Sequence, residues 1–73
     1  MGYPMAKTEN VAFLEYSKIG GEVIAIFSDL QGEQFSMNRR GCELRLKNLK
    51  RNKLPYDETQ KVLDGWPNIS ELA

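Results

Sequence analysis

The residues most able to do chemistry are gathered in one basic stretch, from Arg39 to Lys53 (RRGCELRLKNLKRNK). This stretch carries seven positive side chains and one negative one, Glu43, so its net charge is +6. The 73-residue chain has ten basic and ten acidic residues, so the rest of the chain has a net charge of −6. Because clustered positive charge attracts anions, the stretch predicts an anionic partner. The candidate partner-binding residues are Arg39, Arg40, Arg45, Lys47, Lys50 and Arg51.

Two less specific interpretations of the basic stretch remain open. The charges can form an ordinary solvated helix face, or they can pair with the acids of the same chain. A direct contact with nucleic-acid phosphates is a third possibility. The sequence pI of about 6.2 is far below that of dedicated nucleic-acid-binding domains. The composition therefore favours a protein partner, or a site beside nucleic acid within a larger assembly.

The only cysteine, Cys42, is the one nucleophile of note. Catalysis by a thiol needs a base beside it, and the chain contains no histidine. The neighbouring arginines could lower the thiol pKa, so a reactive cysteine stays an alternative to a buried core residue, which we favour. A single cysteine excludes an internal disulfide, which suits the reducing cytoplasm and predicts a cytoplasmic location.

The remaining polar residues match no known catalytic or metal-binding pattern. Asp57, Glu58, Asp64 and Glu71 lack the spacing of a calcium loop, and Gly20-Gly21 lacks the lysine and serine or threonine of a phosphate loop. No apolar run reaches the roughly 20 residues of a membrane span. We therefore predict a protein that is not an enzyme, with no catalytic residues, no cofactor, no metal site and no membrane contact.

Three aromatic residues have two interpretations each. Tyr16, Tyr56 and Trp66 could stack on bases or fill a partner's pocket. The alternative, which we favour, is that so small a domain needs them in its own core.

Hydrophobic patterning predicts three strands in the first half of the chain. The strands cover residues 11–17, 22–27 and 33–37, and are joined by turns at Gly20-Gly21 and at 28–32. In the first strand, alternation would direct Ala12, Leu14 and Tyr16 to one face and Val11 and Phe13 to the other. The second strand (EVIAIF) is the most β-like run and should lie in the centre of the sheet.

The basic stretch predicts a helix over residues 39–51, with a strand as the alternative for its first half. On a helix, Cys42, Leu46 and Leu49 share one stripe, and Asn38 or Ser36 could cap the start. Leu44 lies off that stripe, and the alternation of Cys42, Leu44 and Leu46 fits a strand. Asn52 could end the helix.

A second helix is predicted from Pro55 or Tyr56 to Asp64, followed by a short helical turn at 69–72. The predicted fold is α+β: a three-stranded antiparallel meander followed by one or two short helices packed on the sheet. We assign residues 1–9 to a flexible N-terminus and residues 10–73 to a single small domain.

In length, in the single-domain meander-plus-helix layout and in the lack of an enzyme signature, the whole chain resembles a family of small bacteriophage-encoded transcription regulators that bind host RNA polymerase, of the type found in a Xanthomonas phage. Neither EVIAIF nor RRGCELRL is by itself diagnostic of that family. The resemblance implies a monomer that docks on the largest polymerase subunits near the RNA exit channel, in the host cytoplasm and close to RNA or DNA. It also implies inhibition of initiation by displacement of the sigma factor, and antitermination. It assigns no individual binding residues. The alternative is a small autonomous nucleic-acid-binding domain that uses residues 39–53.

Overall fold

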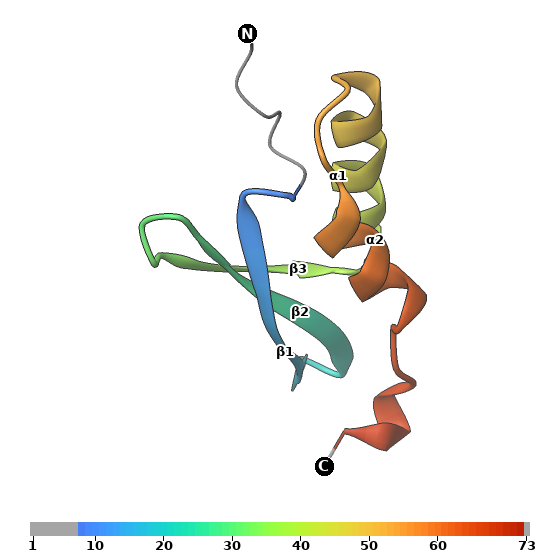
Figure 1. The fold of residues 1–73 in the computed structure, drawn as a ribbon. Helices are drawn as coiled ribbons and strands as arrows, with labels where there is room; N and C mark the ends of the chain where they lie inside the picture. The colour runs from blue at the N-terminus through green and yellow to red at the C-terminus, as the bar shows by residue number, and fades with distance from the viewer. Residues whose placement is uncertain (1–7, 73) are drawn as a thin grey trace, which may run out of the picture.

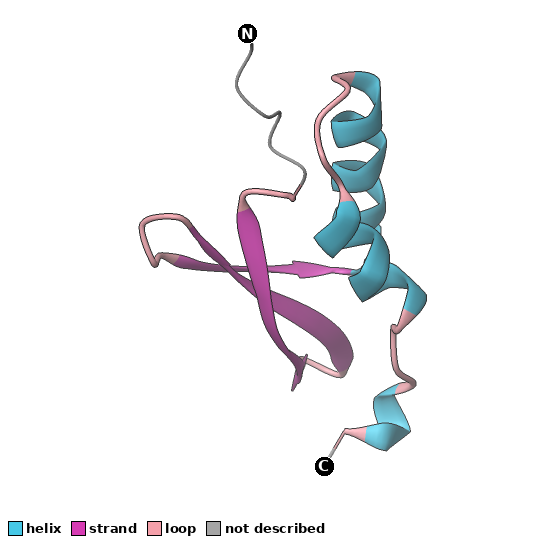
Figure 2. Cartoon of the chain, in the orientation of Figure 1, coloured by secondary structure: helices cyan, strands magenta, loops and turns pink. Residues whose placement is uncertain are grey.

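In the computed structural model, which describes residues 8–72, an antiparallel sheet is followed by two helices (Figures 1 and 2). The strands are β1 (Val11–Ile19), β2 (Glu22–Asp29) and β3 (Gln34–Asn38), in the order β1-β2-β3. The helices are α1 (Arg39–Arg51) and α2 (Asp57–Asp64), with a 3₁₀ turn η1 (Ile69–Glu71) at the end. The predicted α+β fold class is therefore confirmed, and β2 is the central strand.

The two hairpin turns form where their sequences predict them. Gly20 and Gly21 have φ values of 60° and 80°, and two positive φ values in a two-residue loop match the twist of antiparallel strands. In the second turn, the Asp29 carboxylate accepts hydrogen bonds from the backbone N–H groups of Gln31 and Glu33, both at 2.9 Å.

A bulge in β1 overturns the predicted alternation of that strand. Phe13 pairs with Phe27 and Glu15 pairs with Ile26, so Leu14 is an extra residue with no partner on β2. The bulge places Phe13 and Tyr16 on the same face, with their ring centroids 4.7 Å apart. Our expectation that they face opposite sides was wrong, because a strict period of two assumes an uninterrupted ladder.

The core lies between the sheet and the two helices, which cover one face of it (Figure 1). Ala25 and Phe27 of β2 contribute to it, and Cys42 of α1 and Val62 of α2 meet them there. Phe35 of β3 stacks on Phe27 with ring centroids 5.5 Å apart.

Helix α1 has the predicted bounds, and the strand alternative for its first half is wrong. The Asn38 side chain accepts a hydrogen bond from the Gly41 N–H at 2.8 Å, which caps the helix start. At the other end, Leu54 N–H donates to the Leu49 carbonyl and Lys53 adopts a φ of 56°. This is the usual left-handed ending of a helix, here with lysine where glycine is usual.

Among residues 8–72, no helix is both long enough and apolar enough to cross a membrane. Most of the predicted flexible segment, residues 1–7, lies outside the described residues. Its last residue, Glu9, belongs to the folded domain, because only 7% of its surface is exposed and it contacts both helices.

Candidate functional site

Helix α1 has an outward stripe of three cations and one leucine. Arg40, Leu44, Lys47 and Arg51 follow one another at spacings of four, three and four residues, which places them on one side of a helix. All four are exposed. Within residues 8–72, no ion pair is formed by the three cations of the stripe. We call these four residues the outward stripe.

Two further predicted residues, Arg39 and Lys50, flank this stripe. Arg39 forms an ion pair with Glu43 at 3.7 Å, and both side chains are largely exposed. Such a pair contributes little to stability, because water competes for both charges. The Lys50 ammonium lies 5.1 Å from the centre of the Tyr56 ring, in a cation–π contact at the surface. Both charges remain accessible to a partner.

The sixth predicted residue, Arg45, lies on the opposite side of α1 and is engaged within the protein. Its Nε and Nη2 atoms both lie 2.8 Å from one carboxylate oxygen of Glu9, and its guanidinium is 6.0 Å from the centre of the Phe35 ring. Its side chain is 24% exposed, and that of Glu9 is 1% exposed. The structure thus separates Arg45 from the other five predicted residues.

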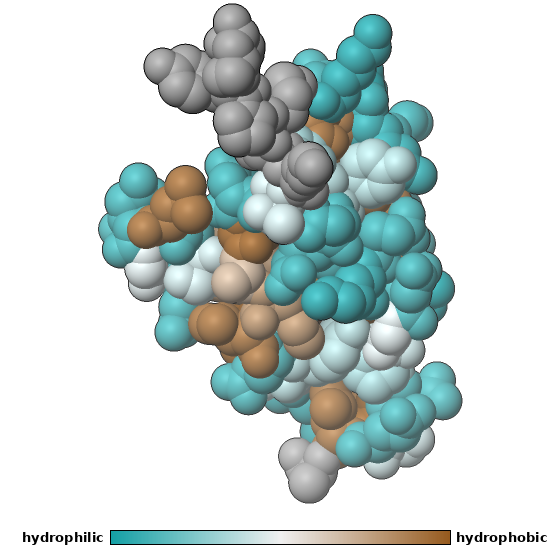
Figure 3. Space-filling model, viewed as in Figure 1, coloured by the Kyte–Doolittle hydropathy of each residue, from teal (hydrophilic) through white to brown (hydrophobic). Residues whose placement is uncertain are grey.

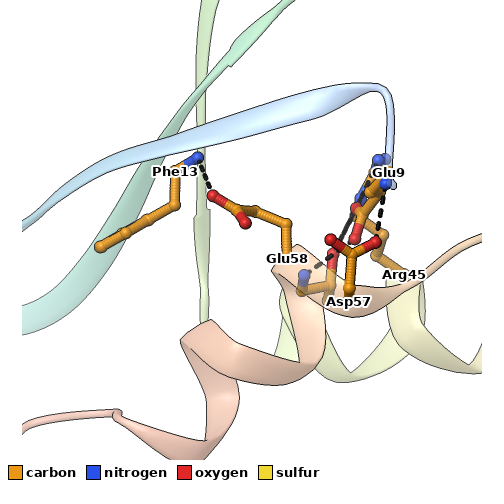
Figure 4. Close-up of polar contacts among 6 residues, drawn as sticks. Glu9, Phe13, Arg45, Asp57 and Glu58 are labelled. Carbon is orange, nitrogen blue, oxygen red and sulfur yellow. Dashed lines mark hydrogen bonds and ion pairs between the residues drawn. The ribbon is translucent and has the colours of Figure 1, made fainter. Parts of the chain in front are cut away.

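Glu9 also holds the start of α2 (Figure 4). One carboxylate oxygen accepts a hydrogen bond from the Thr59 N–H at 2.8 Å, and the other accepts one from the Thr59 hydroxyl at 2.5 Å. Thr59 is the third residue of α2, and its N–H has no partner within the helix. The residue at the helix cap, Tyr56, makes no capping hydrogen bond through its side chain, so Glu9 supplies the cap from a distant part of the chain.

Two acids at the start of α2 accept hydrogen bonds from the backbone of β1 and of the segment just before it (Figure 4). The Asp57 carboxylate accepts from the Glu9 N–H at 2.7 Å, and the Glu58 carboxylate accepts from the Phe13 N–H at 2.8 Å. β1 is an edge strand, so Glu58 occupies one of its unpaired donors. Together with Glu9 and Arg45, these bonds connect β1, α1 and α2. The outward stripe is therefore displayed on a helix with a fixed position.

Cys42 lies on the buried side of α1, in the apolar core. It is fully buried. Burial, opposed by the nearby Arg45 and reinforced by Glu9 and Glu43, raises the pKa of the Cys42 thiol to about 11. The thiol is therefore uncharged at neutral pH, which supports the core interpretation over a reactive cysteine.

Of the three aromatic candidates, two belong to the core. The Tyr16 hydroxyl donates a hydrogen bond to the Val62 carbonyl at 2.7 Å, and the Tyr16 and Trp66 rings meet edge to face at 5.5 Å. Burial, and secondarily the nearby Cys42, raises the pKa of Tyr16. Tyr56 is the exposed one, at 40%. Only Tyr56 remains a candidate contact for a partner.

Leu44 is the part of the site that sequence reasoning missed. It is 53% exposed in the middle of the cations of the outward stripe. A signal was present, because Leu44 did not fit the buried stripe of the predicted helix. We had taken that misfit as evidence for a strand, whereas it marks an apolar residue on the solvent side. In the view of Figure 3, the side with the helices is mainly hydrophilic, and apolar residues gather over the strands.

The exposed cations of the site can attract an anionic partner. Residues 8–72 contain no group of three or more acids, cysteines or histidines able to hold a metal ion. The thiol of Cys42 has a pKa of about 11, so almost none of it is in the nucleophilic thiolate form at neutral pH. Comparison of the chain with protein-family models, curated proteins and solved structures gives no match.

Proposed function

We propose that this protein is a bacteriophage regulator that binds the RNA polymerase of its bacterial host through the exposed cations of α1. It acts as a monomer in the host cytoplasm and has no enzymatic activity. The resemblance supplies the partner and the consequences: docking on the large subunits near the RNA exit channel, displacement of the sigma factor and antitermination. The site supplies a means of attachment.

The outward stripe is the observation that supports this proposal most strongly. Its three cations are exposed and, among the described residues, unpaired. An ion pair between Arg45 and the buried Glu9 ties α1 to the segment before β1, and Glu9 in turn bonds to Thr59 of α2. A cation on a rigid element loses less conformational entropy on binding than one on a loose tail. Complementary charge also speeds the encounter with a large anionic partner. A fixed cationic face suits recognition of a specific surface.

The test is binding to purified bacterial RNA polymerase, followed by transcription from a sigma-dependent promoter. The wild-type protein should bind, reduce promoter-dependent initiation, and increase readthrough of a terminator by elongating polymerase. Arg40→Glu, Lys47→Glu and Arg51→Glu together should remove these effects. Lys18→Glu with Lys61→Glu, which reverses exposed cations outside α1, is the control and should leave them. Absence of binding at low salt by the wild-type protein would rule the proposal out.

The same three cations also favour a second candidate, an autonomous nucleic-acid-binding domain. In that case free DNA or RNA should bind in the micromolar range, with an affinity that falls steeply as salt rises. The formally neutral charge of the chain argues against it, because dedicated nucleic-acid modules are strongly basic. Titration of labelled duplex DNA and single-stranded RNA at about 50 mM salt separates the two candidates.

A further inference from the structure

An apolar groove runs alongside the outward stripe. It has a volume of about 370 Å³ and lies along one side of α1, between the helix and the end of β3. Leu44 belongs to both the groove and the stripe, so the two surfaces are continuous. The groove is lined by Met37, Gly41, Leu44, Arg45, Asn48, Leu49 and Asn52.

At one end of the groove, a glycine at the start of α1 lies close to the end of β3. A side-chain carbon on Gly41 would lie 3.2 Å from the Cβ atom of Met37, so only glycine lets the helix approach the end of β3 this closely without displacement. From Gly41 to Asn52 the helix rises about 16 Å, at roughly 1.5 Å per residue. That length matches about three turns of a second helix lying alongside.

The groove and the stripe have different chemistry, and an occupant must suit both. The groove offers the apolar side chains of Met37, Leu44 and Leu49, beside the partly exposed Arg45. The stripe offers the charges of Arg40 and Lys47 on either side of Leu44, with Arg51 one turn further on. A nucleic-acid backbone would use the cations but would leave Leu44 without an apolar partner. An amphipathic peptide helix with acidic flanks satisfies both surfaces, because its apolar residues fill the groove and its carboxylates meet the cations.

We infer that α1 is the docking surface for an acidic amphipathic helix of the partner, anchored by an apolar side chain against Leu44. The inference deepens the proposed function, on which it rests for the identity of the polymerase. The occupant is defined by charge complementarity: no acid lies on the outward stripe, and the one acid of α1, Glu43, pairs with Arg39. The apolar anchor provides the central contact and the cations form its rim.

A single substitution, Leu44→Lys, distinguishes this occupant from a phosphate backbone. It adds a cation to the stripe and removes the apolar anchor. Binding to an acidic amphipathic helix should therefore weaken about tenfold or more, which is the loss expected for a central apolar contact. Binding to nucleic acid should instead strengthen, because one more positive charge faces the phosphates. The helix itself should tolerate the change, since leucine and lysine have similar helix propensities and the site is exposed.

The experiment uses a synthetic amphipathic peptide of about 15 residues, with leucines at spacings of four and three flanked by glutamates. Backbone amide NMR signals of the labelled full-length protein report where it binds, and fluorescence anisotropy gives the dissociation constant. Saturable shifts at Gly41, Leu44 and Asn48, lost in Leu44→Lys, are expected. Leu30→Lys, the same change at an exposed leucine of the second hairpin turn, is the matched control and should bind normally. A peptide with lysines in place of the glutamates should not bind.

Purified polymerase and duplex DNA are titrated with the same variants. Weaker polymerase binding by Leu44→Lys, with unchanged binding by Leu30→Lys, supports the docking surface. The docking surface is overturned if both variants bind polymerase equally well. It is also overturned if the peptide causes no saturable shifts on α1, or if Leu44→Lys binds every ligand more tightly. The two proposals fail separately. If the peptide binds and the polymerase does not, the proposed function is wrong and the surface stands, whereas normal polymerase binding by Leu44→Lys leaves the function and removes the surface.

Discussion

Arg45 and Lys47 lie two residues apart on α1, yet their surroundings have little in common. Arg45 faces the interior, bonded to the buried Glu9 carboxylate at 2.8 Å. Lys47 faces solvent on the outward stripe, without an ion partner among the described residues. The first connects parts of the fold, and the second is available to another molecule. A charge count along the chain treats the two alike, so the number of basic residues overstates the charge available for binding.

The two sides of α1 should therefore differ in how far a substitution there changes the stability of the fold. The inward side depends on satisfied polar groups, since a buried carboxylate without its partners is costly. The outward side has no such requirement, and substitutions there should change stability little. The predictions below compare the two sides, beginning with the largest expected effect.

The first prediction concerns Arg45→Met, which keeps most of the side-chain volume and removes the charge. The Glu9 carboxylate would then keep only its hydrogen bonds from Thr59, so the free energy of unfolding at neutral pH should fall by about 3–5 kcal/mol. Urea unfolding followed by the fluorescence of the single tryptophan, Trp66, measures the loss.

Arg40→Met, the same substitution on the outward side, is the control and should change stability by less than about 0.5 kcal/mol. Adding Glu9→Gln to Arg45→Met should recover part of the loss, since it removes the unpaired buried charge. Equal effects of Arg45→Met and Arg40→Met would remove the distinction between the two sides.

The second prediction concerns Cys42 and high pH. Its pKa in the folded protein is about 11, above the ordinary value of 9.0, so the folded state holds the thiol proton more tightly than the unfolded state. The stabilising contribution is complete below about pH 9. It is lost as pH rises towards about 11, with a slope of up to roughly 1.4 kcal/mol per pH unit.

Urea unfolding at several pH values measures this slope for the wild type and for Cys42→Ala. Tyr16, whose pKa is also raised, contributes a slope of the same sign, and it is present in both proteins. The variant should therefore show a shallower decline. If the free energy of unfolding falls equally steeply with pH in the wild type and in Cys42→Ala, then burial on α1 does not raise the pKa of the Cys42 thiol.

A third, smaller effect is expected where α1 ends. Lys53 adopts a φ of 56°, which is unfavourable for a residue with a side chain. Lys53→Gly should relieve this strain and raise the free energy of unfolding by about 1 kcal/mol. Lys47→Gly, inside the helix, should lower it by about the same amount. Urea denaturation of the two variants should thus give changes of opposite sign, and a loss of stability in Lys53→Gly would contradict the assigned helix ending.

Much of the fold follows from local signals in the sequence. Helix α1 was predicted with its bounds and with Asn38 as one of two possible caps, because a capping side chain and an apolar stripe are properties of neighbouring residues. The same is true of the Gly20-Gly21 turn. The bulge at Leu14 was not predictable in this way, because it depends on how β1 pairs with β2.

The candidate site was only partly predictable for the same reason. Five of the six proposed cations are exposed on α1, as a charged helix implies. Arg45 is bonded to Glu9, which is 36 residues away in the chain, and no local pattern indicates that contact. In the sequence, Asp57 and Glu58 match no calcium-loop spacing, and nothing local indicates which groups they contact. They bond to the backbone of Glu9 and Phe13, which requires the tertiary fold.

The central claim is that the outward side of α1 binds an anionic partner and is not needed by the fold. It is tested most directly by comparing two pairs of substitutions that remove the same charge. Lys47→Gln with Arg51→Gln alters the outward stripe, and Lys18→Gln with Lys61→Gln alters exposed cations on β1 and α2. The measurement is the affinity of each variant for purified RNA polymerase, with the free energy of unfolding determined on the same samples.

The α1 pair should lose about tenfold in affinity, equivalent to roughly 1.4 kcal/mol, and remain as stable as the wild type within about 0.5 kcal/mol. The second pair should bind normally. Equal losses of affinity in both pairs would mean that the partner responds to overall charge alone, and undiminished binding by the α1 pair would contradict the claim.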